Sequence, residues 1–287
     1  MWLNHPVERI DLKINKALIK AKNAISRYQF NTLNKAVGVN AAGQIAIEAD
    51  IVSEDNFIRT LISEQVNGVL YSEESGVKEI GNPSEDKESS FIFLLDPLDG
   101  SHNYKNRVPI GCISLAYGKY KENPTLGDLD KAYILNLYGE DLFFSSNDSG
   151  SWFNGDQLTY TKFDDQNGIK MSYYAYGKNS RNYYLDFMNN DTYTVRSLGS
   201  AAWELAMVAI NTNDIFADIR GVLKTHDFAA AKIILQNIGY DFQFINNSLQ
   251  SKNIPLDDFK TGYSVIASRD KKLSNSIVTQ FNSTQNI

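Results

Sequence analysis

Two aspartates, Asp96 and Asp99, stand three positions apart at the end of an apolar run over residues 91–95. An apolar run of this length that is followed by proline and glycine is typical of a buried strand ending in a turn. Two carboxylates on a tight turn suit Mg²⁺, a cation that prefers oxygen ligands. The alternative is an Asx-turn, in which both carboxylates only accept hydrogen bonds from nearby backbone N–H groups.

The residues around these aspartates predict a turn into a helix. Pro97 has no N–H to donate, so we expect the strand's ladder to stop there. Gly100 permits a tight turn, and Ser101 is a suitable N-cap for the helix that follows. Free N–H groups at a helix start bind phosphate. A cation and a phosphate in one place are the minimum for phosphoryl chemistry.

Three more acidic positions stand at the ends of predicted elements. Asp50 begins a predicted helix, Glu73 and Glu74 follow a short strand, and Asp227 begins another helix. Each has an ordinary structural interpretation, as a helix N-cap or as part of a solvated turn. None of these positions alone indicates a metal site. Their occurrence together with Asp96 and Asp99 in one chain favours such a site.

Composition narrows the classes of function. The 287 residues suffice for one large domain or two closely packed ones, and a formal charge of −6 argues against a nucleic-acid partner. A single cysteine, Cys112, allows no internal disulfide, which favours a reducing cytoplasm. The N-terminus has no signal-peptide pattern, and no apolar run reaches the ~20 residues of a membrane span.

Periodicity predicts alternating helices and strands, hence a layered α and β fold. We expect loops over 31–44 and 77–89, and an antiparallel meander over 113–145. Polar residues 164–168 suggest a junction between an N-terminal part, 1–164, and a C-terminal part, 165–287. The predicted helices are 6–28, 51–62, 181–190, a helix from 200, 228–237 and 271–281; the predicted strands are 69–71, 91–95, 113–120, 131–137, 142–145, 149–155, 169–174, 193–196, 215–218 and 263–267.

Three motifs together resemble the inositol monophosphatase superfamily, over nearly the whole chain. The run 218–224, Asp-Ile-Arg-Gly-Val-Leu-Lys, is similar to the archaeal-type branch, which handles both inositol monophosphate and fructose 1,6-bisphosphate. One departure is His226, which stands where many members have Trp. The motifs are Asp96-Pro97-Leu98-Asp99-Gly100-Ser101-His102-Asn103-Tyr104, Ser72-Glu73-Glu74-Ser75-Gly76 and His226-Asp227-Phe228-Ala229.

The resemblance implies a layered αβαβα sandwich and a Mg²⁺-dependent phosphatase that uses a metal-activated water. Asp96 would be shared between two ions, Asp50 and Glu73 would reach a third, and Mn²⁺ could substitute. Ser101 and Glu73 would orient and deprotonate the attacking water, with Asp50 as a further catalytic residue. The implied ligands of the first two ions are Glu73, Asp96, the Leu98 carbonyl, Asp99 and Asp227.

The resemblance also implies a small phosphorylated substrate, a homodimer and a cytoplasmic location. Arg196, Arg220 and Lys224 could hold the second phosphate of a bisphosphate, although each could equally be an ordinary surface charge. The implied substrate-binding residues are Asp99, Gly100, Ser101, Arg196, Ser200, Ala201, Asp218, Arg220 and Lys224.

Two other functions remain open at this point. A nucleotidase for 3′-phosphoadenosine 5′-phosphate shares the central motif, but no aromatic cluster can be assigned to an adenine pocket. A non-catalytic sugar-phosphate sensor is the other alternative. A retired enzyme usually loses a metal ligand, and here all of them are present, which favours activity.

Overall fold

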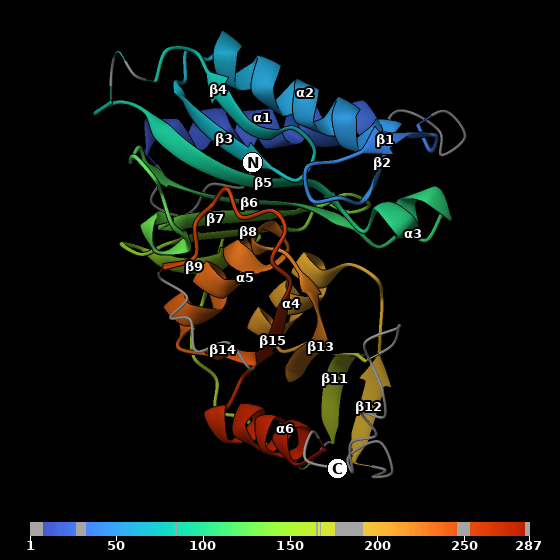
Figure 1. Ribbon diagram of the computed structural model, residues 1–287. Helices are drawn as coiled ribbons and strands as arrows, with labels where there is room; N and C mark the ends of the chain where they lie inside the picture. The colour runs from blue at the N-terminus through green and yellow to red at the C-terminus, as the bar shows by residue number, and fades with distance from the viewer. Residues whose placement is uncertain are drawn as a thin grey trace.

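The helices and strands form five stacked layers in the order α, β, α, β, α (Figure 1). The computed structural model describes residues 8–26, 33–83, 85, 87–164, 166, 168–175, 192–245 and 253–284. Three clusters of buried apolar side chains fill the spaces between the layers. This is the αβαβα sandwich that the family resemblance implies.

The first layer consists of two long helices, α1 (Arg9–Ser26) and α2 (Glu48–Ser63). Their buried residues recur every three or four positions, as Ile14, Leu18, Ala21 and Ile25 do in α1. These side chains pack on one face of the first sheet. Both helices match predicted ones; α1 begins at Arg9, and residues 6, 7, 27 and 28 of its expected range 6–28 lie outside the described residues.

The second layer is an eight-stranded sheet in the order β10-β9-β8-β7-β6-β5-β3-β4. Strand β5 runs parallel to β3 and antiparallel to β6. Strands β6, β7 and β8 form the predicted meander, and β9 and β10 extend it with antiparallel pairing. The bounds are β3 (Gly68–Ser72), β4 (Gly76–Ile80), β5 (Phe91–Asp99), β6 (Cys112–Lys119), β7 (Lys131–Asn136), β8 (Leu142–Ser146), β9 (Gly150–Phe153) and β10 (Asp156–Leu158).

Strand β5 is buried on both faces, which explains its unbroken apolar run. Ile92 and Leu94 pack toward the middle helical layer, whereas Phe93 and Leu95 pack toward α1 and α2. Alternate side chains of a strand point to opposite faces of its sheet, so a strand between two helical layers needs apolar residues at every position.

The third layer holds α4 (Ala201–Ala209) and α5 (Thr225–Ile238), and α6 (Lys271–Thr284) forms the fifth (Figure 1). Between them lies a five-stranded sheet, ordered β12 (Tyr193–Arg196), β11 (Ile169–Tyr174), β13 (Ile215–Leu223), β15 (Tyr263–Ser268), β14 (Asp241–Ile245). The predicted helix over 181–190 lies outside the described residues. The proposed division at 164/165 falls between the two sheets.

Several expectations were wrong in detail. The predicted loop over 31–44 contains β1 (Ala36–Val39), which pairs with β2 (Ile45–Ile47), and the loop over 77–89 begins with β4. All of β1 and the middle of β4 are exposed, so these strands lack the apolar alternation that reveals a strand. Strand β14 was not expected, and a short 3-10 helix covers Leu126–Asp128.

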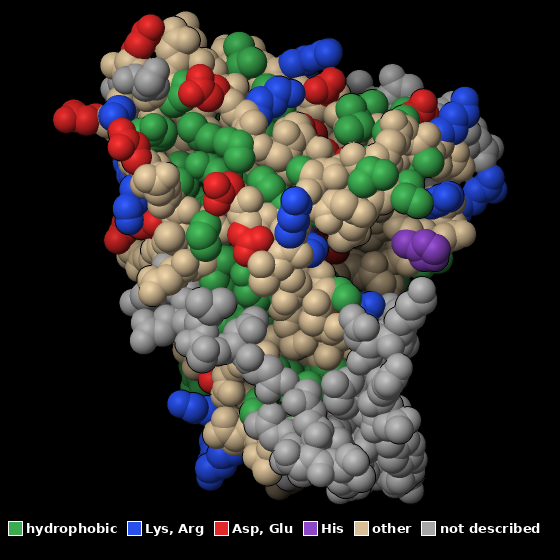
Figure 2. All heavy atoms as spheres, viewed as in Figure 1, with side chains coloured by type: hydrophobic (Ala, Val, Ile, Leu, Met, Phe, Trp, Pro, Cys, Tyr) green, Lys and Arg blue, Asp and Glu red, His purple; other side chains and the backbone are tan. Residues whose placement is uncertain are grey.

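Among the described residues, no helix has both the length and the apolar character needed to cross a membrane. On the face shown in Figure 2, acidic and basic side chains are interspersed, without a continuous basic field. A continuous basic field is the usual footprint of nucleic-acid binding.

Candidate active site

A bulge in β5 turns Asp96 and Asp99 to the same face of the first sheet. In a regular strand, residues three apart point to opposite faces. Here Asp96 pairs with Ser114 and Asp99 with Cys112, so β5 carries one residue more than β6 over this stretch. Pro97 lies inside the bulge, where a missing N–H costs no ladder bond. The strand therefore continues to Asp99, two residues beyond the end expected at Pro97.

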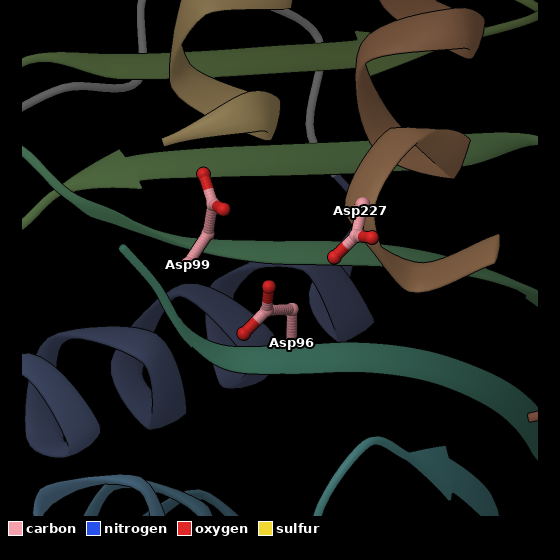
Figure 3. Close-up of side chains that lie close together, drawn as sticks. All are labelled: Asp96, Asp99 and Asp227. Carbon is pink, nitrogen blue, oxygen red and sulfur yellow. The ribbon is translucent and has the colours of Figure 1, made fainter. Parts of the chain in front are cut away.

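Asp227 completes a group of three aspartates. It lies in the first turn of α5, where its Oδ2 accepts a hydrogen bond from the Lys224 N–H at 2.7 Å. One oxygen from each of Asp96, Asp99 and Asp227 lies within 4.8 Å of the others. The three side chains come from β5 and α5 and lie close together (Figure 3). Asp227 is thus the third residue of α5 and not the N-cap that the sequence suggested.

The N-terminus of α4 holds the carboxylate of Asp99. Its oxygens accept hydrogen bonds from the N–H groups of Ala201 (3.1 Å) and Ala202 (2.9 Å) and from the hydroxyl of Ser200. A helix N-terminus stabilises negative charge through its free N–H groups and its dipole. Ser200 and Ala201, expected to bind substrate, therefore use these polar groups to position Asp99.

Glu73 approaches the cluster from the end of β3, beside β5. Because β3 and β5 are parallel, their carboxyl ends meet at one edge of the sheet. Asn40, from the β1–β2 hairpin, donates through Nδ2 to Glu73 Oε1 (3.0 Å) and to Glu74 Oε1 (3.1 Å). Sequence reasoning missed Asn40, since a lone Asn in a stretch expected to be a loop gives no signal.

Ser101 lies in the short helix α3 (Ser101–Lys105), and its hydroxyl faces Asp50. The hydroxyl donates to Asp50 Oδ1 at 2.7 Å, with the Leu98 carbonyl oxygen 2.9 Å away as a second acceptor. The expected joint action of Ser101 and Glu73 on the attacking water stays a prediction. The position before the helix belongs to Gly100, whose φ of +95° favours glycine, so Ser101 is not the N-cap. Asp50 is not an N-cap either; it lies in the first turn of α2 and accepts from the Ile47 N–H.

Burial and like charge raise the pKa values of the acidic residues. Burial, then Asp227, raises the pKa of Glu73 well above its usual range; burial, then Glu73, does the same for the pKa of Asp96. Burial raises the pKa of Asp99 to about 6, and burial with Asp99 nearby raises the pKa of Asp227 to about 7. Shifts of this size show that the cluster resists ionisation in the absence of a cation.

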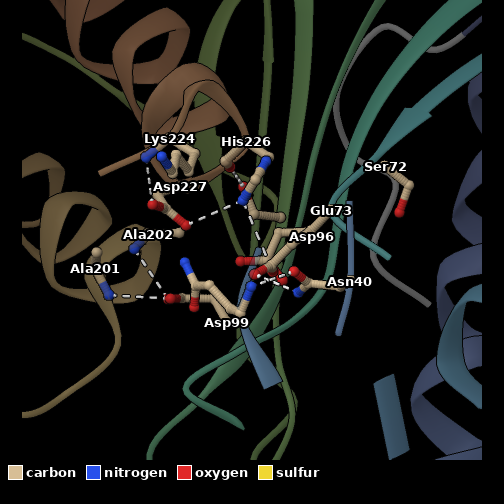
Figure 4. Close-up of polar contacts among 12 residues, drawn as sticks. Asn40, Ser72, Glu73, Asp96, Asp99, Ala201, Ala202, Lys224, His226 and Asp227 are labelled. Carbon is tan, nitrogen blue, oxygen red and sulfur yellow. Dashed lines mark hydrogen bonds and ion pairs between the residues drawn. The ribbon is translucent and has the colours of Figure 1, made fainter. Parts of the chain in front are cut away.

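His226 adds an imidazole to this cluster. Its side chain is fully buried, and Nε2 lies 3.7 Å from Glu73 Oε2 and 3.6 Å from Asp227 Oδ1 (Figure 4). Burial lowers the pKa of His226 to about 3, so the ring is neutral. The sequence marked His226 only as a departure from the family pattern and gave no hint that its ring faces the acids.

A cleft of about 610 Å³ opens over the cluster. Arg220 lines it, but Nε and a terminal nitrogen of its guanidinium contact the buried Asp218 carboxylate, and the group stacks 4.7 Å from the Tyr174 ring. Of the other residues expected to bind substrate, Gly100 and Ser101 line the cleft, as do Asp99 and Ala201, whereas Asp218, Ser200, Arg196 and Lys224 do not.

Neither of the two remaining cations expected at the substrate lines the cleft. Arg196 is exposed on β12, and Lys224 donates through Nζ to the Lys260 carbonyl oxygen at 2.6 Å. Their role in holding a second phosphate stays a prediction.

The donor set fits a hard divalent cation. The carboxylates of Asp96 and Glu73 are buried, and neighbouring carboxylates raise their pKa values further, so the ionised cluster would hold a concentrated negative charge that a cation would neutralise. Oxygen-only ligation is the pattern that Mg²⁺, Mn²⁺ and Ca²⁺ share.

Comparison with known proteins shows the family to which this chain belongs. The inositol monophosphatase family model matches residues 5–286. A fructose-1,6-bisphosphatase/inositol-1-monophosphatase of Methanothermobacter thermautotrophicus is 31% identical over 193 residues, covering 66% of this chain and 68% of the relative. Its namesake from Archaeoglobus fulgidus is 30% identical over 235 residues, covering 81% and 83%. A crystal structure titled inositol monophosphatase-fructose 1,6 bisphosphatase superimposes with a TM-score of 0.77 at 22% identity, covering 95% of this chain and all of the other.

Replacing Asp96 by Asn tests whether the cluster is a cation site. Removing one buried negative charge relieves repulsion, so the metal-free Asp96→Asn protein should melt about 2 °C or more above wild type. The same variant should lose the rise in melting temperature that saturating Mg²⁺ gives wild type. Asp156→Asn, on an exposed strand end, is the matched control and should behave as wild type. An Asp96→Asn protein still stabilised by Mg²⁺ would contradict the assignment.

Proton release on binding tests the raised pKa values. Carboxyls with pKa values near 6 and 7 are partly protonated at about pH 6, and a cation binds only their ionised form. Mg²⁺ binding should therefore release protons at about pH 6 and fewer at about pH 8.5, so affinity rises with pH. Calorimetry in two buffers of different ionisation enthalpy measures this. Proton release that does not fall as the pH rises would count against the pKa shifts.

Proposed function

Because the chain belongs to the inositol monophosphatase family of phosphatases, we propose that it hydrolyses phosphate monoesters of polyols and sugars with Mg²⁺. The observation that carries this proposal is the convergence of Asp96, Asp99 and Asp227 at the base of a cleft. The substrates we expect are inositol 1-phosphate and fructose 1,6-bisphosphate, because the two archaeal relatives are named fructose-1,6-bisphosphatase/inositol-1-monophosphatase.

The acidic residues of the cleft are proposed to hold two or three cations, with Mn²⁺ as a possible replacement for Mg²⁺. Bound cations would neutralise the phosphate dianion and lower the pKa of an attacking water. Asp50 and Glu73 would reach the third ion. The proposed ligands for the first two are Glu73, Asp96, the Leu98 carbonyl, Asp99 and Asp227.

Ser101 and Asp50 are proposed to take the proton of the attacking water. The Ser101 hydroxyl already donates to Asp50 Oδ1, so it can accept a hydrogen bond from water while its own proton moves toward Asp50. Burial raises the pKa of Asp50 to about 6, which makes it a stronger base than a free Asp yet leaves it mostly ionised at neutral pH. Glu73, on the other side of the cluster, would orient the same water.

The rest of the cleft is proposed to select the substrate. Its volume is in the range of small-molecule sites. Arg220 is the one Arg or Lys among the described residues that line it, and its guanidinium is already paired with Asp218. A second phosphate would have to compete with that pair. We therefore expect kcat/KM to be higher for inositol 1-phosphate than for fructose 1,6-bisphosphate.

The homodimer and the cytoplasmic location implied by the resemblance also belong to this proposal. Light scattering should give a molar mass of twice the 32.3 kDa of one chain. The mass of a single chain at micromolar protein concentration would contradict the proposed dimer.

Ser101→Ala tests the proton path. Losing a positioned acid–base group typically costs about 10²- to 10⁴-fold in rate, and we expect kcat to fall by about 100-fold with little change in KM or in Mg²⁺ affinity. Lys105→Ala, exposed on the same short helix, is the control and should keep wild-type kcat. Undiminished turnover by Ser101→Ala would exclude this hydroxyl from the mechanism.

A substrate panel tests the reaction itself. Phosphate release should be measured with Mg²⁺ from inositol 1-phosphate, fructose 1,6-bisphosphate and 3′-phosphoadenosine 5′-phosphate. We expect turnover of the first two, with the order of kcat/KM given above. Turnover of the nucleotide alone would move the protein to the nucleotidase alternative. Mg²⁺-dependent binding without turnover of any of the three would favour a sensor.

A further inference from the structure

The His226 imidazole is a buried polar group without a partner. Neither ring nitrogen has a hydrogen bond among the described residues, although the side chain is fully shielded from solvent. A buried donor that is left without an acceptor destabilises the fold, because its hydrogen bond to water is lost and not replaced. A fold that places such a ring beside its acidic cluster therefore points to an interaction that forms when the cluster is in use.

The position of the ring identifies the partners. Nε2 is 3.7 Å from Glu73 Oε2 and 3.6 Å from Asp227 Oδ1, and both distances exceed the roughly 3.2 Å upper limit of an N–H···O hydrogen bond. A bound cation would keep both neighbouring carboxylates ionised, and an ionised carboxylate only accepts hydrogen bonds. Nε2 is therefore the nitrogen that should carry the hydrogen of the neutral ring. The backbone is fixed behind the ring, since the His226 carbonyl accepts from Ser114 Oγ on β6 at 3.3 Å and the residue lies in the first turn of α5.

We propose that His226 is a positioning residue that donates its Nε2–H to the carboxylates of Glu73 and Asp227, fixing which of their oxygens face the cations. This rests on the metal-dependent function proposed above. Glu73 reaches the cluster from β3 and Asp227 from α5, so one donor between them ties together two ligands from different layers of the fold. Groups that orient metal ligands in this way commonly change metal affinity about 10- to 100-fold when they are removed.

Two substitutions separate hydrogen bonding from packing. His226→Phe keeps an aromatic ring but has no donor, whereas His226→Gln loses the ring and keeps an N–H at similar reach. We expect calorimetric Mg²⁺ affinity to fall about 10-fold or more in His226→Phe and to recover most of that loss in His226→Gln. Thr225→Val, a buried neighbour in the same turn with no assigned role, is the control and should bind Mg²⁺ as wild type does.

Nitrogen-15 NMR of labelled histidine provides a readout that activity does not. The proposal predicts a neutral ring protonated at Nε2 and bare at Nδ1, with the Nε2 hydrogen exchanging more slowly once Mg²⁺ is bound. A ring protonated at Nδ1, or a Mn²⁺-loaded protein in which Nε2 is bonded directly to the ion, would overturn it.

The results of these experiments separate the positioning role of His226 from the proposed Mg²⁺-dependent function on which it rests. A wild-type protein that binds no Mg²⁺ would overturn the proposed function. Wild-type affinity in His226→Phe together with a loss in His226→Gln would overturn only the role of His226, because it would show that the ring is there for packing.

Discussion

The mutual repulsion of buried carboxylates is the constraint on which this structure depends. Asp96, Asp99 and Asp227 face one another within 4.8 Å, and Glu73 raises the pKa of Asp96 further. Such an arrangement is unfavourable unless something of opposite charge is present. The fold offsets part of the cost with helix N-termini. α4 directs its first N–H groups at Asp99, and Asp50 and Asp227 each accept from the N–H that precedes their own helix. The remaining charge is what a bound cation would neutralise.

The bulge at Pro97 converts an ordinary strand end into this site. Without the extra residue, Asp96 and Asp99 would point to opposite helical layers, and no ion could contact both. The other parts are placed relative to that bulge. β3 runs parallel to β5 and delivers Glu73 to the same edge, and the Ser53 hydroxyl of α2 donates to the Pro97 carbonyl oxygen at 2.7 Å, which fixes α2 and Asp50 against it. The positions of the acidic side chains in the cleft thus depend on the backbone of these strands and of α2 more than on the conformation of loops.

The sequence singled out three aspartates that the fold brings together, Asp96, Asp99 and Asp227, but not how they are arranged. The unbroken apolar run of β5, the period of α1 and the acidic positions at element ends are local signals, so they could be read directly. The bulge, the approach of α4 to Asp99 and the pairing of Ser101 with Asp50 depend on tertiary packing, which leaves no local pattern. Exposed strands such as β1 and β4 lack a buried face and so lack the alternation by which a strand is recognised. The pairing of Arg220 with Asp218 needed the structure, since i and i+2 side chains need not meet.

We propose that Asp96 is a ligand of two cations. Asp99 and Asp227 would bind one of them, and Glu73 would bind the other. Diffraction from crystals soaked in Mn²⁺, measured for its anomalous signal, tests this most directly. We expect one anomalous peak within coordination distance of Asp96, Asp99 and Asp227, and a second peak within coordination distance of Asp96 and Glu73. Mn²⁺ found only elsewhere on the molecule, with no peak touching Asp96, would contradict the central claim.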